Sequence, residues 1–527
     1  MINKNSKNRT SERGPQISVV MKHLKNLTWA ICLLPALLSS CSSSKNNDAV
    51  DVPEPALQSY GFYAADNAGK LAKDYVVTSI PTTGKIAIAL PTFIENLNLV
   101  ARFTTNDGNT VAVGGQAQVS KTSSNDFSIP ADYIVGNSSG TLYKKYTVTV
   151  SKASDMVWSS FANYSNNTVY GGMEMKLSPT DDTPYVAYKI RNSDDDTKAK
   201  VVVLKLVDNV WTPVGDEAGF SGGEVYSSYY GLDIDSKGTP YVAYADNSNS
   251  LSGCPTVAKW NGSTWETVGS IGLNDTQATY LDIAMDENDS PVLTMVNASR
   301  KSAFSRYDFV AATYSSAWNS ALLPGRAPAT ATYMSSMNRG ADKAVYAALI
   351  HRGKVGGVNY GLSVFKYAAS QWTTIRDNTI QEGATQTSIA LKILGVIAAS
   401  DGTVYLSSSD NAASNGGSVY NVRIEKYNAS TQTWSTVGNV IDRKVDTSLQ
   451  VKMALAPDGT LFVMYQDIQK YPTVIYFDND TKQWSSPIAL SQTAATDLNI
   501  GFTKAGIGYA SFVDPDGHIA TYKYDAK

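Results

Sequence analysis

The sequence has little charge, few cysteines and no long apolar segment, and each deficit excludes a class of protein. Charged residues are 17% of the 527 residues, and 44 Lys and Arg stand against 47 Asp and Glu, a formal net charge of -3. This balance lacks the basic surface that nucleic-acid binding requires. Cys32, Cys41 and Cys254 are the three cysteines. Because Cys32 falls in a predicted export signal, we expect no disulfide in the mature chain.

The apolar run at residues 27–38 is too short to span a bilayer and predicts the core of a secretory signal. Lys22 and Lys25 precede it, and it leads into the sequence LSSC, which ends at Cys41. This ending resembles a bacterial lipobox, which implies cleavage before Cys41 and lipidation of that cysteine. A plain secreted protein and a buried helix are the alternatives.

The amino-terminal segments are therefore assigned to export and anchoring. We expect residues 1–40 to be a signal peptide whose true start is Met21, and residues 41–57 to be the lipidated cysteine with a flexible tether. The expected location is the outer membrane or cell surface, with a lipid anchor at Cys41.

Tryptophans recur at nearly equal steps along the rest of the chain. Only Trp29 and Trp260 fall outside a series whose successive separations are 53, 54, 53, 54, 62 and 50 residues. Four short β segments fit within each step, which is typical of a β-propeller. The series is Trp158, Trp211, Trp265, Trp318, Trp372, Trp434 and Trp484.

The last repeat indicates how the predicted ring closes. Residues 499–524 give three strand candidates and no tryptophan, whereas the segment around Trp158 gives one strand with no repeat of its own. We predict that these four strands form one sheet, which leaves no exposed sheet edge. The fold class is thus all-β: residues 154–527 form a seven-bladed β-propeller closed by both ends, with the tryptophans as packing residues.

Residues 58–152 lack the tryptophan period and predict a separate β-sandwich of immunoglobulin type, with seven short strands. This module resembles the Ig-like or cadherin-like modules of Bacteroidetes surface lipoproteins, although Ser139 stands where an acidic residue is common. The resemblance implies a spacer without catalytic residues. It rests on Phe127, Pro130, Tyr133, Gly140, Tyr146, Val148 and Val150.

The turns NGSTW before Trp265 and DNDTKQW before Trp484 faintly resemble the aspartate-box turns of sialidase-type propellers. Both are shorter than that motif, and the Phe-Arg-Ile-Pro signature of a sialidase catalytic domain is absent from the sequence. The likeness implies a shared architecture at most.

A tyrosine precedes the predicted inner strand in four consecutive repeats. Tyrosine rings stack on sugars and their hydroxyls bond to sugar hydroxyls, so these residues are candidate glycan ligands at the mouth of the channel. The alternative is that they fill the channel as core residues. They are Tyr170, Tyr230, Tyr280 and Tyr333.

Polar loops on the same predicted face supply further candidates. A carboxylate pair for glycoside hydrolysis could come from these loops or from Asp233 and Asp282 near the channel, and no spacing rule selects the pair. His351 with Tyr333 would suit a polysaccharide lyase. Residues 194–196 could hold calcium, but solvation is the simpler interpretation, and we predict no metal and no cofactor. The loop candidates for ligand binding are Arg191, Asp246, Arg300, His351, Arg352, Asp410 and Asp467.

No catalytic motif accompanies these residues, so the first hypothesis is a propeller that binds a polysaccharide or a surface protein without catalysis. The alternative is a glycoside hydrolase or polysaccharide lyase with its site at the channel mouth. A purely structural assembly component is the third possibility.

Overall fold

A computed structural model describes residues 54–71, 74–77, 79–91, 94–152, 156–191, 199–220, 225–248, 251–299, 302–323, 331–355, 357–380, 394–409, 421–441, 451–479 and 481–526. The chain divides into two units, residues 1–53 and 54–527, and the first lies outside these ranges. The predicted signal peptide, Cys41 and most of the tether therefore lie outside them as well. Within them, no helix combines the length and apolar character needed to cross a membrane.

The fold is all-β, as predicted. The described residues contain 40 strands and one short 3-10 helix, η1 (Ala64–Asp66). Every strand belongs to a small sheet, and none of the sheets that these residues form closes on itself.

The first nine strands form two sheets, with strand orders β2-β1-β4-β7 and β3-β9-β8-β5-β6. Alternate side chains of β3 and β4 are buried, which is the period of a half-buried strand. One core lies between the sheets, where the Tyr60 and Tyr133 rings meet edge to face at 5.2 Å between centroids. The strands are β1 (Leu57–Phe62), β2 (Tyr75–Val76), β3 (Lys85–Leu90), β4 (Asn98–Thr105), β5 (Thr110–Val113), β6 (Gln116–Ala117), β7 (Ser124–Asp126), β8 (Ala131–Gly136) and β9 (Tyr143–Lys152).

All seven strands expected in this region are present. The structure also contains two strands, β6 and β7, that were not predicted from the sequence. β6 and β7 are two and three residues long and mostly exposed, so they carry no apolar alternation that could have revealed them.

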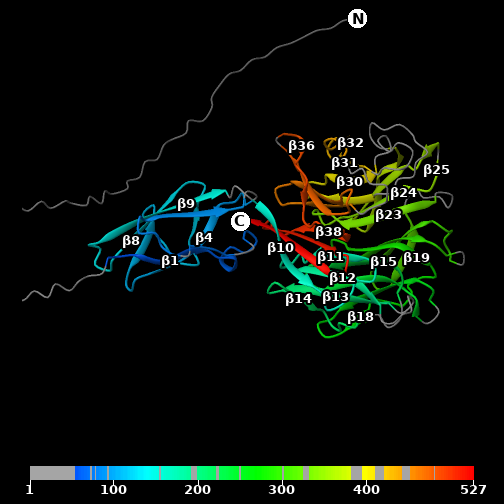
Figure 1. Ribbon diagram of the computed structural model, residues 1–527, viewed down its shortest axis with the longest axis horizontal. Coiled ribbons are helices and arrows are strands. Elements are labelled where there is room, and N and C mark those ends of the chain that lie inside the picture. Colours follow the sequence, from blue (N-terminus) through cyan, green and yellow to red (C-terminus); the bar gives the residue numbers. More distant parts are fainter. Residues whose placement is uncertain are drawn as a thin grey trace, which may run out of the picture. The chain divides into compact units, whose positions relative to one another are not determined.

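Seven four-stranded antiparallel sheets follow in the described part of the chain, one of them with β37 as an extra short strand (Figure 1). The first three run in chain order: β11 (Met173–Leu177), β12 (Pro184–Arg191), β13 (Ala199–Val207), β14 (Val210–Pro213); β15 (Val225–Ile234), β16 (Pro240–Asp246), β17 (Cys254–Trp260), β18 (Trp265–Thr267); β19 (Ala278–Met285), β20 (Pro291–Asn297), β21 (Phe309–Tyr314), β22 (Trp318–Leu322).

The fourth sheet is interrupted by a small hairpin, β25 with β26, between its second and third strands. The next sheets are β23 (Thr332–Arg339), β24 (Val345–His351), β27 (Leu362–Ala368), β28 (Gln371–Thr379), with the hairpin β25 (Lys354–Val355) and β26 (Val358–Asn359); β29 (Leu394–Ala398), β30 (Val404–Ser409), β31 (Val422–Asn428), β32 (Thr433–Thr436); β33 (Val451–Leu455), β34 (Leu461–Gln466), β35 (Pro472–Asp478), β36 (Gln483–Trp484), with β37 (Ile488–Ala489).

The last sheet combines both ends of this region. Its order is β10 (Met156–Tyr164), β40 (Ile519–Ala526), β39 (Gly508–Val513), β38 (Thr496–Phe502), and Trp158 stands opposite Tyr524 in the β10–β40 pair. In Figure 1, cyan β10 runs beside the red end of the chain. The prediction that the Trp158 strand completes the final sheet is confirmed.

The first strands of the seven sheets contact one another in cyclic order. β11 lies against β15, then β19, β23, β29, β33 and β38 follow, and β38 lies against β11. Between them, apolar side chains of successive sheets interdigitate: Val186 and Ala187 on β12 are both fully buried but belong to different core clusters. Side chains on opposite faces of one strand thus bind one sheet to both of its neighbours.

Polar side chains on four of these first strands accept hydrogen bonds from the main chain of the next. Because each bond pairs one side chain with one backbone N–H, it fixes how neighbouring sheets align. The acceptors are Asn499 Oδ1 from Met175 N (3.0 Å), Glu174 Oε2 from Leu232 N (3.2 Å), Asp233 Oδ2 from Met285 N (2.6 Å) and Asp282 Oδ2 from Met337 N (3.0 Å).

The repeating tryptophans are packing residues, as expected. Trp265 Nε1 donates to Val214 O at 2.8 Å, and Trp318 Nε1 donates to Val268 O at 2.7 Å. Each acceptor lies just after the outer strand of the preceding sheet, so each indole joins two sheets at their outer edges.

Candidate functional site

The candidate site lies at the end of the first sheet where β11 begins and β12 ends. Met173 pairs with Tyr188 across these strands, so Tyr170 and Arg191 come to the same end of the sheet. The Tyr170 N–H donates to the carbonyl of Lys189 at 2.6 Å, which fixes the tyrosine beside the end of β12.

Two cations surround the Tyr170 ring. The Arg191 guanidinium carbon is 4.3 Å from the ring centroid and its Nη2 donates to the tyrosine hydroxyl at 2.9 Å, while Lys189 Nζ is 4.9 Å from the centroid. Burial, followed by the like charge of Arg191, lowers the pKa of Lys189. The cation–π contacts orient the ring, since each is favourable over the ring face.

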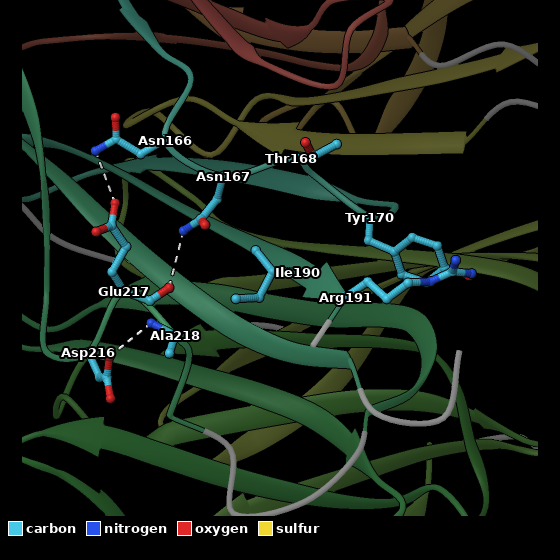
Figure 2. A pocket seen from close by; sticks show the side chains of 9 residues that line it. All are labelled: Asn166, Asn167, Thr168, Tyr170, Ile190, Arg191, Asp216, Glu217 and Ala218. Carbon is cyan, nitrogen blue, oxygen red and sulfur yellow. Dashed lines mark hydrogen bonds between the residues drawn. The ribbon is translucent and has the colours of Figure 1, made fainter. Parts of the chain in front are cut away.

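A cavity of about 770 Å³ opens next to this cluster. Figure 2 shows Tyr170 and Arg191 on one side, Asn166, Asn167 and Glu217 on the other, and the aliphatic side chain of Ile190 between them in this view. The cavity is lined by Asn166, Asn167, Thr168, Tyr170, Ile190, Arg191, Asp216, Glu217 and Ala218.

Hydrogen bonds position the carboxylate side of the cavity. The Tyr164 hydroxyl and Asn166 Nδ2 both donate to Glu217 Oε1, the second at 3.1 Å, and Asn167 Nδ2 donates to the Glu217 carbonyl at 3.1 Å. Burial and then the bond to Glu217 raise the pKa of Tyr164 well above its usual range, so the phenol stays a donor. An ionised carboxylate has more acceptor positions than these two donors use, so Glu217 can accept further bonds.

The four predicted tyrosines do not share one environment. Tyr170 is half-buried at the cavity, whereas Tyr230 is buried and its hydroxyl donates to the carbonyl of Gly172. Tyr280 and Tyr333 are half-buried and pack against different core clusters. Tyr230 is thus a core residue, and the expectation that it faces a ligand is corrected by its burial.

His351 and Asp246 are also placed in the interior. His351 is fully buried with Nε2 2.9 Å from Ser363 Oγ, so its ring cannot reach a polysaccharide and the acid–base pair with Tyr333 is corrected. Asp246 is buried and accepts hydrogen bonds from Ser248 N and Thr256 Oγ1 at 2.8 and 3.2 Å, as a residue that supports its own turn.

The other predicted residues divide into three groups. Arg352 is exposed and its guanidinium lies over the Tyr307 ring, 4.0 Å from the centroid. Asp467 accepts backbone hydrogen bonds from Gln469 and Tyr471 and so organises the turn between β34 and β35. Arg300, Asp410 and residues 194–196 lie outside the described residues.

Asp233 and Asp282, one of the possible carboxylate pairs for hydrolysis, accept the inter-sheet hydrogen bonds described above. Burial raises the pKa of both, and for Asp282, where repulsion from Glu174 adds to it, the pKa reaches about 7. Each carboxylate already accepts a hydrogen bond from the main chain of the next sheet and so has a structural role. The expectation that the pair could serve in catalysis is therefore corrected.

One group of side chains within the described ranges could hold a metal ion. The ligand atoms of Asp514, Asp516 and His518 lie within 4.8 Å of one another on the turn between β39 and β40. Asp514 Oδ1 already accepts the N–H groups of Asp516 and His518, so the turn is explained without an ion.

Sequence reasoning found Tyr170 and Arg191 but missed Tyr164, Asn167 and Glu217. Glu217 follows the outer strand β14, in a loop that the tryptophan period assigned to a connection between repeats. The asparagine-rich segment before Tyr170 was the one available signal, because loops at strand ends carry ligand contacts more often than the strands do.

No protein-family model matches the chain, and no curated protein matches its sequence. Solved structures that resemble it include proteins that act on glycans. An ulvan lyase is 13% identical with a TM-score of 0.44, over 71% of this chain and 96% of that one. A Penicillium chrysogenum alpha-L-arabinanase complexed with arabinobiose is 11% identical, with a TM-score of 0.39 over 71% and 99%.

A Streptococcus pneumoniae sialidase is 12% identical, with a TM-score of 0.39 over 90% of this chain and 93% of that one. Every one of these TM-scores is below 0.5, so these likenesses carry no information on the function of this chain.

Proposed function

We propose that the chain is an exported lipoprotein in which an Ig-like sandwich, residues 58–152, precedes a seven-bladed β-propeller, residues 154–527. The cyclic contacts of the first strands and the shared last sheet support the propeller. The two sheets over one core support the sandwich. Export and lipidation at Cys41 rest on the signal-like sequence before it.

The propeller binds a glycan in the cavity beside Tyr170, without cleaving it. The observation that carries this proposal is the composition of the cavity wall: aromatic and aliphatic surface at Tyr170 and Ile190, with amide and carboxylate groups of Asn166, Asn167 and Glu217 around it. Sugars present apolar ring faces edged by hydroxyls, and such a wall offers partners for both.

The polar groups of the wall are held in place before a ligand arrives. The Glu217 carboxylate accepts hydrogen bonds from Tyr164 and Asn166, and the Tyr170 hydroxyl accepts one from Arg191. Preorganised groups lose little conformational entropy on binding, so each new hydrogen bond contributes more of its energy to affinity.

The test is a glycan array with the full mature protein, followed by calorimetry on each glycan that binds. A double variant, Asn166→Ala with Glu217→Gln, is expected to weaken binding about tenfold or more, because it removes two wall contacts while Gln still accepts the Tyr164 bond. Asn288→Ala, on the exposed turn between β19 and β20, is the control and should bind as the wild type does. Equal affinity of all three proteins would contradict the proposal.

The second candidate is a polysaccharide-degrading enzyme at the same cavity. The observation that favours it is that Glu217 and Tyr170, two groups able to transfer protons, line one cavity beside Arg191. Incubation with each bound polysaccharide, followed by assays for new reducing ends and unsaturated uronates, separates the two. Product formed by the wild type and lost in Glu217→Gln would replace the binding proposal with the catalytic one.

A further inference from the structure

Two exposed arginines from different sheets converge on one tyrosine, away from the Tyr170 cavity. The guanidinium carbon of Arg306 is 4.7 Å from the centroid of the Tyr307 ring, and that of Arg352 is 4.0 Å from it. Arg306 precedes β21 in the third sheet, and Arg352 follows β24 in the fourth. The ring thus holds two positive charges at a junction between sheets.

Neither guanidinium is neutralised by a carboxylate within the ranges that the structure describes. Asp308, close to Arg306 in the chain, is 3% exposed and its Oδ2 accepts the Ser305 N–H at 2.8 Å. Burial raises the pKa of Asp308, which further weakens it as a counter-ion. Two unpaired exposed cations in one place favour the approach of an anion.

The main chain fixes the positions of Tyr307 and Arg352. The Tyr307 N–H donates to Asn297 O at 2.6 Å and its carbonyl accepts the Thr332 N–H at 2.7 Å, while the Arg352 N–H donates to Ala331 O at 2.7 Å. Tyr307 has φ +73°, a conformation that is costly for a tyrosine and is kept when the surroundings impose it, often at ligand sites.

Aromatic surface continues beside the arginines. Tyr333 follows Thr332 directly and meets the Tyr360 ring edge to face at 6.2 Å between centroids. The Tyr360 N–H donates to the carbonyl of Gly353, the neighbour of Arg352. Both rings are half-buried, so part of each remains open to solvent.

From this arrangement we infer that Arg306, Tyr307 and Arg352 form a second site, which binds the sulfate ester or carboxylate group of an acidic polysaccharide. A guanidinium donates two parallel hydrogen bonds to either anion, and adjacent tyrosine rings suit the sugar that carries it. The inference rests on the proposed glycan-binding function and specifies that the glycan is anionic.

The two sites open at equivalent ends of their sheets. Arg352 follows the end of β24, which pairs with the start of β23, just as Arg191 ends β12, which pairs with the start of β11. The residues of the two sites therefore lie at corresponding strand ends of the first and the fourth sheet.

The experiment measures affinity of the full mature protein for three probes: chondroitin sulfate, unsulfated chondroitin and neutral laminarin. Arg306→Gln with Arg352→Gln is expected to weaken binding of the acidic probes about tenfold or more and to leave laminarin binding unchanged. Loss for chondroitin sulfate alone assigns the site to sulfate, and equal loss for both acidic probes assigns it to carboxylate. Affinity for the acidic probes should also fall as salt rises.

Two further variants separate a site from general charge. Lys343→Gln with Lys482→Gln removes two exposed charges from other turns and should change affinity less than twofold. Arg306→Lys with Arg352→Lys keeps the charge but removes the planar donors, so its affinity should lie between the wild type and the Gln variant. Equal losses in the two Gln variants would overturn the site.

The outcomes also distinguish this inference from the function on which it rests. If the Arg306 and Arg352 variant binds as the wild type while the Asn166 and Glu217 variant binds weakly, the second site is overturned and the cavity stands. If the wild type binds no polysaccharide, both fail. Melting temperatures of all variants within a few degrees of the wild type establish that the comparison is between folded proteins.

Discussion

At the scale of single residues, the protonation of Asp282 is expected to make the stability of the protein depend on pH. Burial and then repulsion from Glu174 raise its pKa to about 7, against the opposing attraction of Lys176 and Lys452. The folded protein therefore holds this proton more tightly than the unfolded chain, whose Asp pKa is about 4. By linkage, the contribution of Asp282 to stability is greatest below about pH 4 and declines as pH rises to about 7.

Asp282→Asn is expected to remove this part of the pH dependence. Asn keeps an oxygen that can accept the Met337 N–H but carries no charge, so the variant should be more stable than the wild type at pH 8 and similar to it at pH 4. Urea unfolding at both values measures the change. Asp467→Asn, at a turn, serves as control, and an unaltered pH slope in Asp282→Asn would count against the explanation.

At the scale of elements, contacts between a tryptophan and a glycine join neighbouring sheets. Gly269 has φ +77°, and a Cβ built on it would lie 2.8 Å from Cδ1 and Nε1 of Trp318, which donates to the carbonyl of Val268. The third sheet can therefore approach the second only where residue 269 has no side chain.

Gly269→Ala should lower the free energy of unfolding by about 1–3 kcal/mol, because it adds a steric clash to an unfavourable backbone conformation. Gly262→Ala is the matched control: Gly262 has φ +101° but no atom within 4 Å of the added Cβ. Chemical denaturation of both variants gives the comparison. If Gly269→Ala lowers the free energy of unfolding no more than Gly262→Ala does, the Trp318 indole must move aside to accept the added methyl group.

The repeated elements were predictable from sequence, whereas only Tyr170 and Arg191 of the site were. Tryptophans such as Trp265 and Trp318 recur because each packs its sheet against the preceding one, so their period predicted the strands and the shared last sheet. Glu217 occurs in one loop only and repeats nowhere. Nor could the sequence place His351 inside and Arg352 outside. Every residue of β24 is buried up to His351, Arg352 is exposed directly after the strand, and the residue at which a strand ends is poorly marked in a sequence.

At the scale of the whole molecule, β40 is the element on which the ring depends. It pairs with β10 on one side and β39 on the other, so its loss leaves two strands with unsatisfied edges. Removal of residues 519–527 should abolish cooperative unfolding and make the chain sensitive to proteolysis. Removal of Lys527 alone is the control and should have little effect; a cooperative transition in the longer truncation would contradict the prediction.

The β10–β40 pair also sets the order in which this protein can mature. The ribosome synthesises residues 156–164 long before residues 519–526. β10 therefore has no β40 to pair with until every intervening sheet has been synthesised. Translation that stops early yields a chain with exposed edges, which quality-control proteases and aggregation both recognise. Only a chain that already includes residues 519–526 can pair the edge of β10 and complete the last sheet.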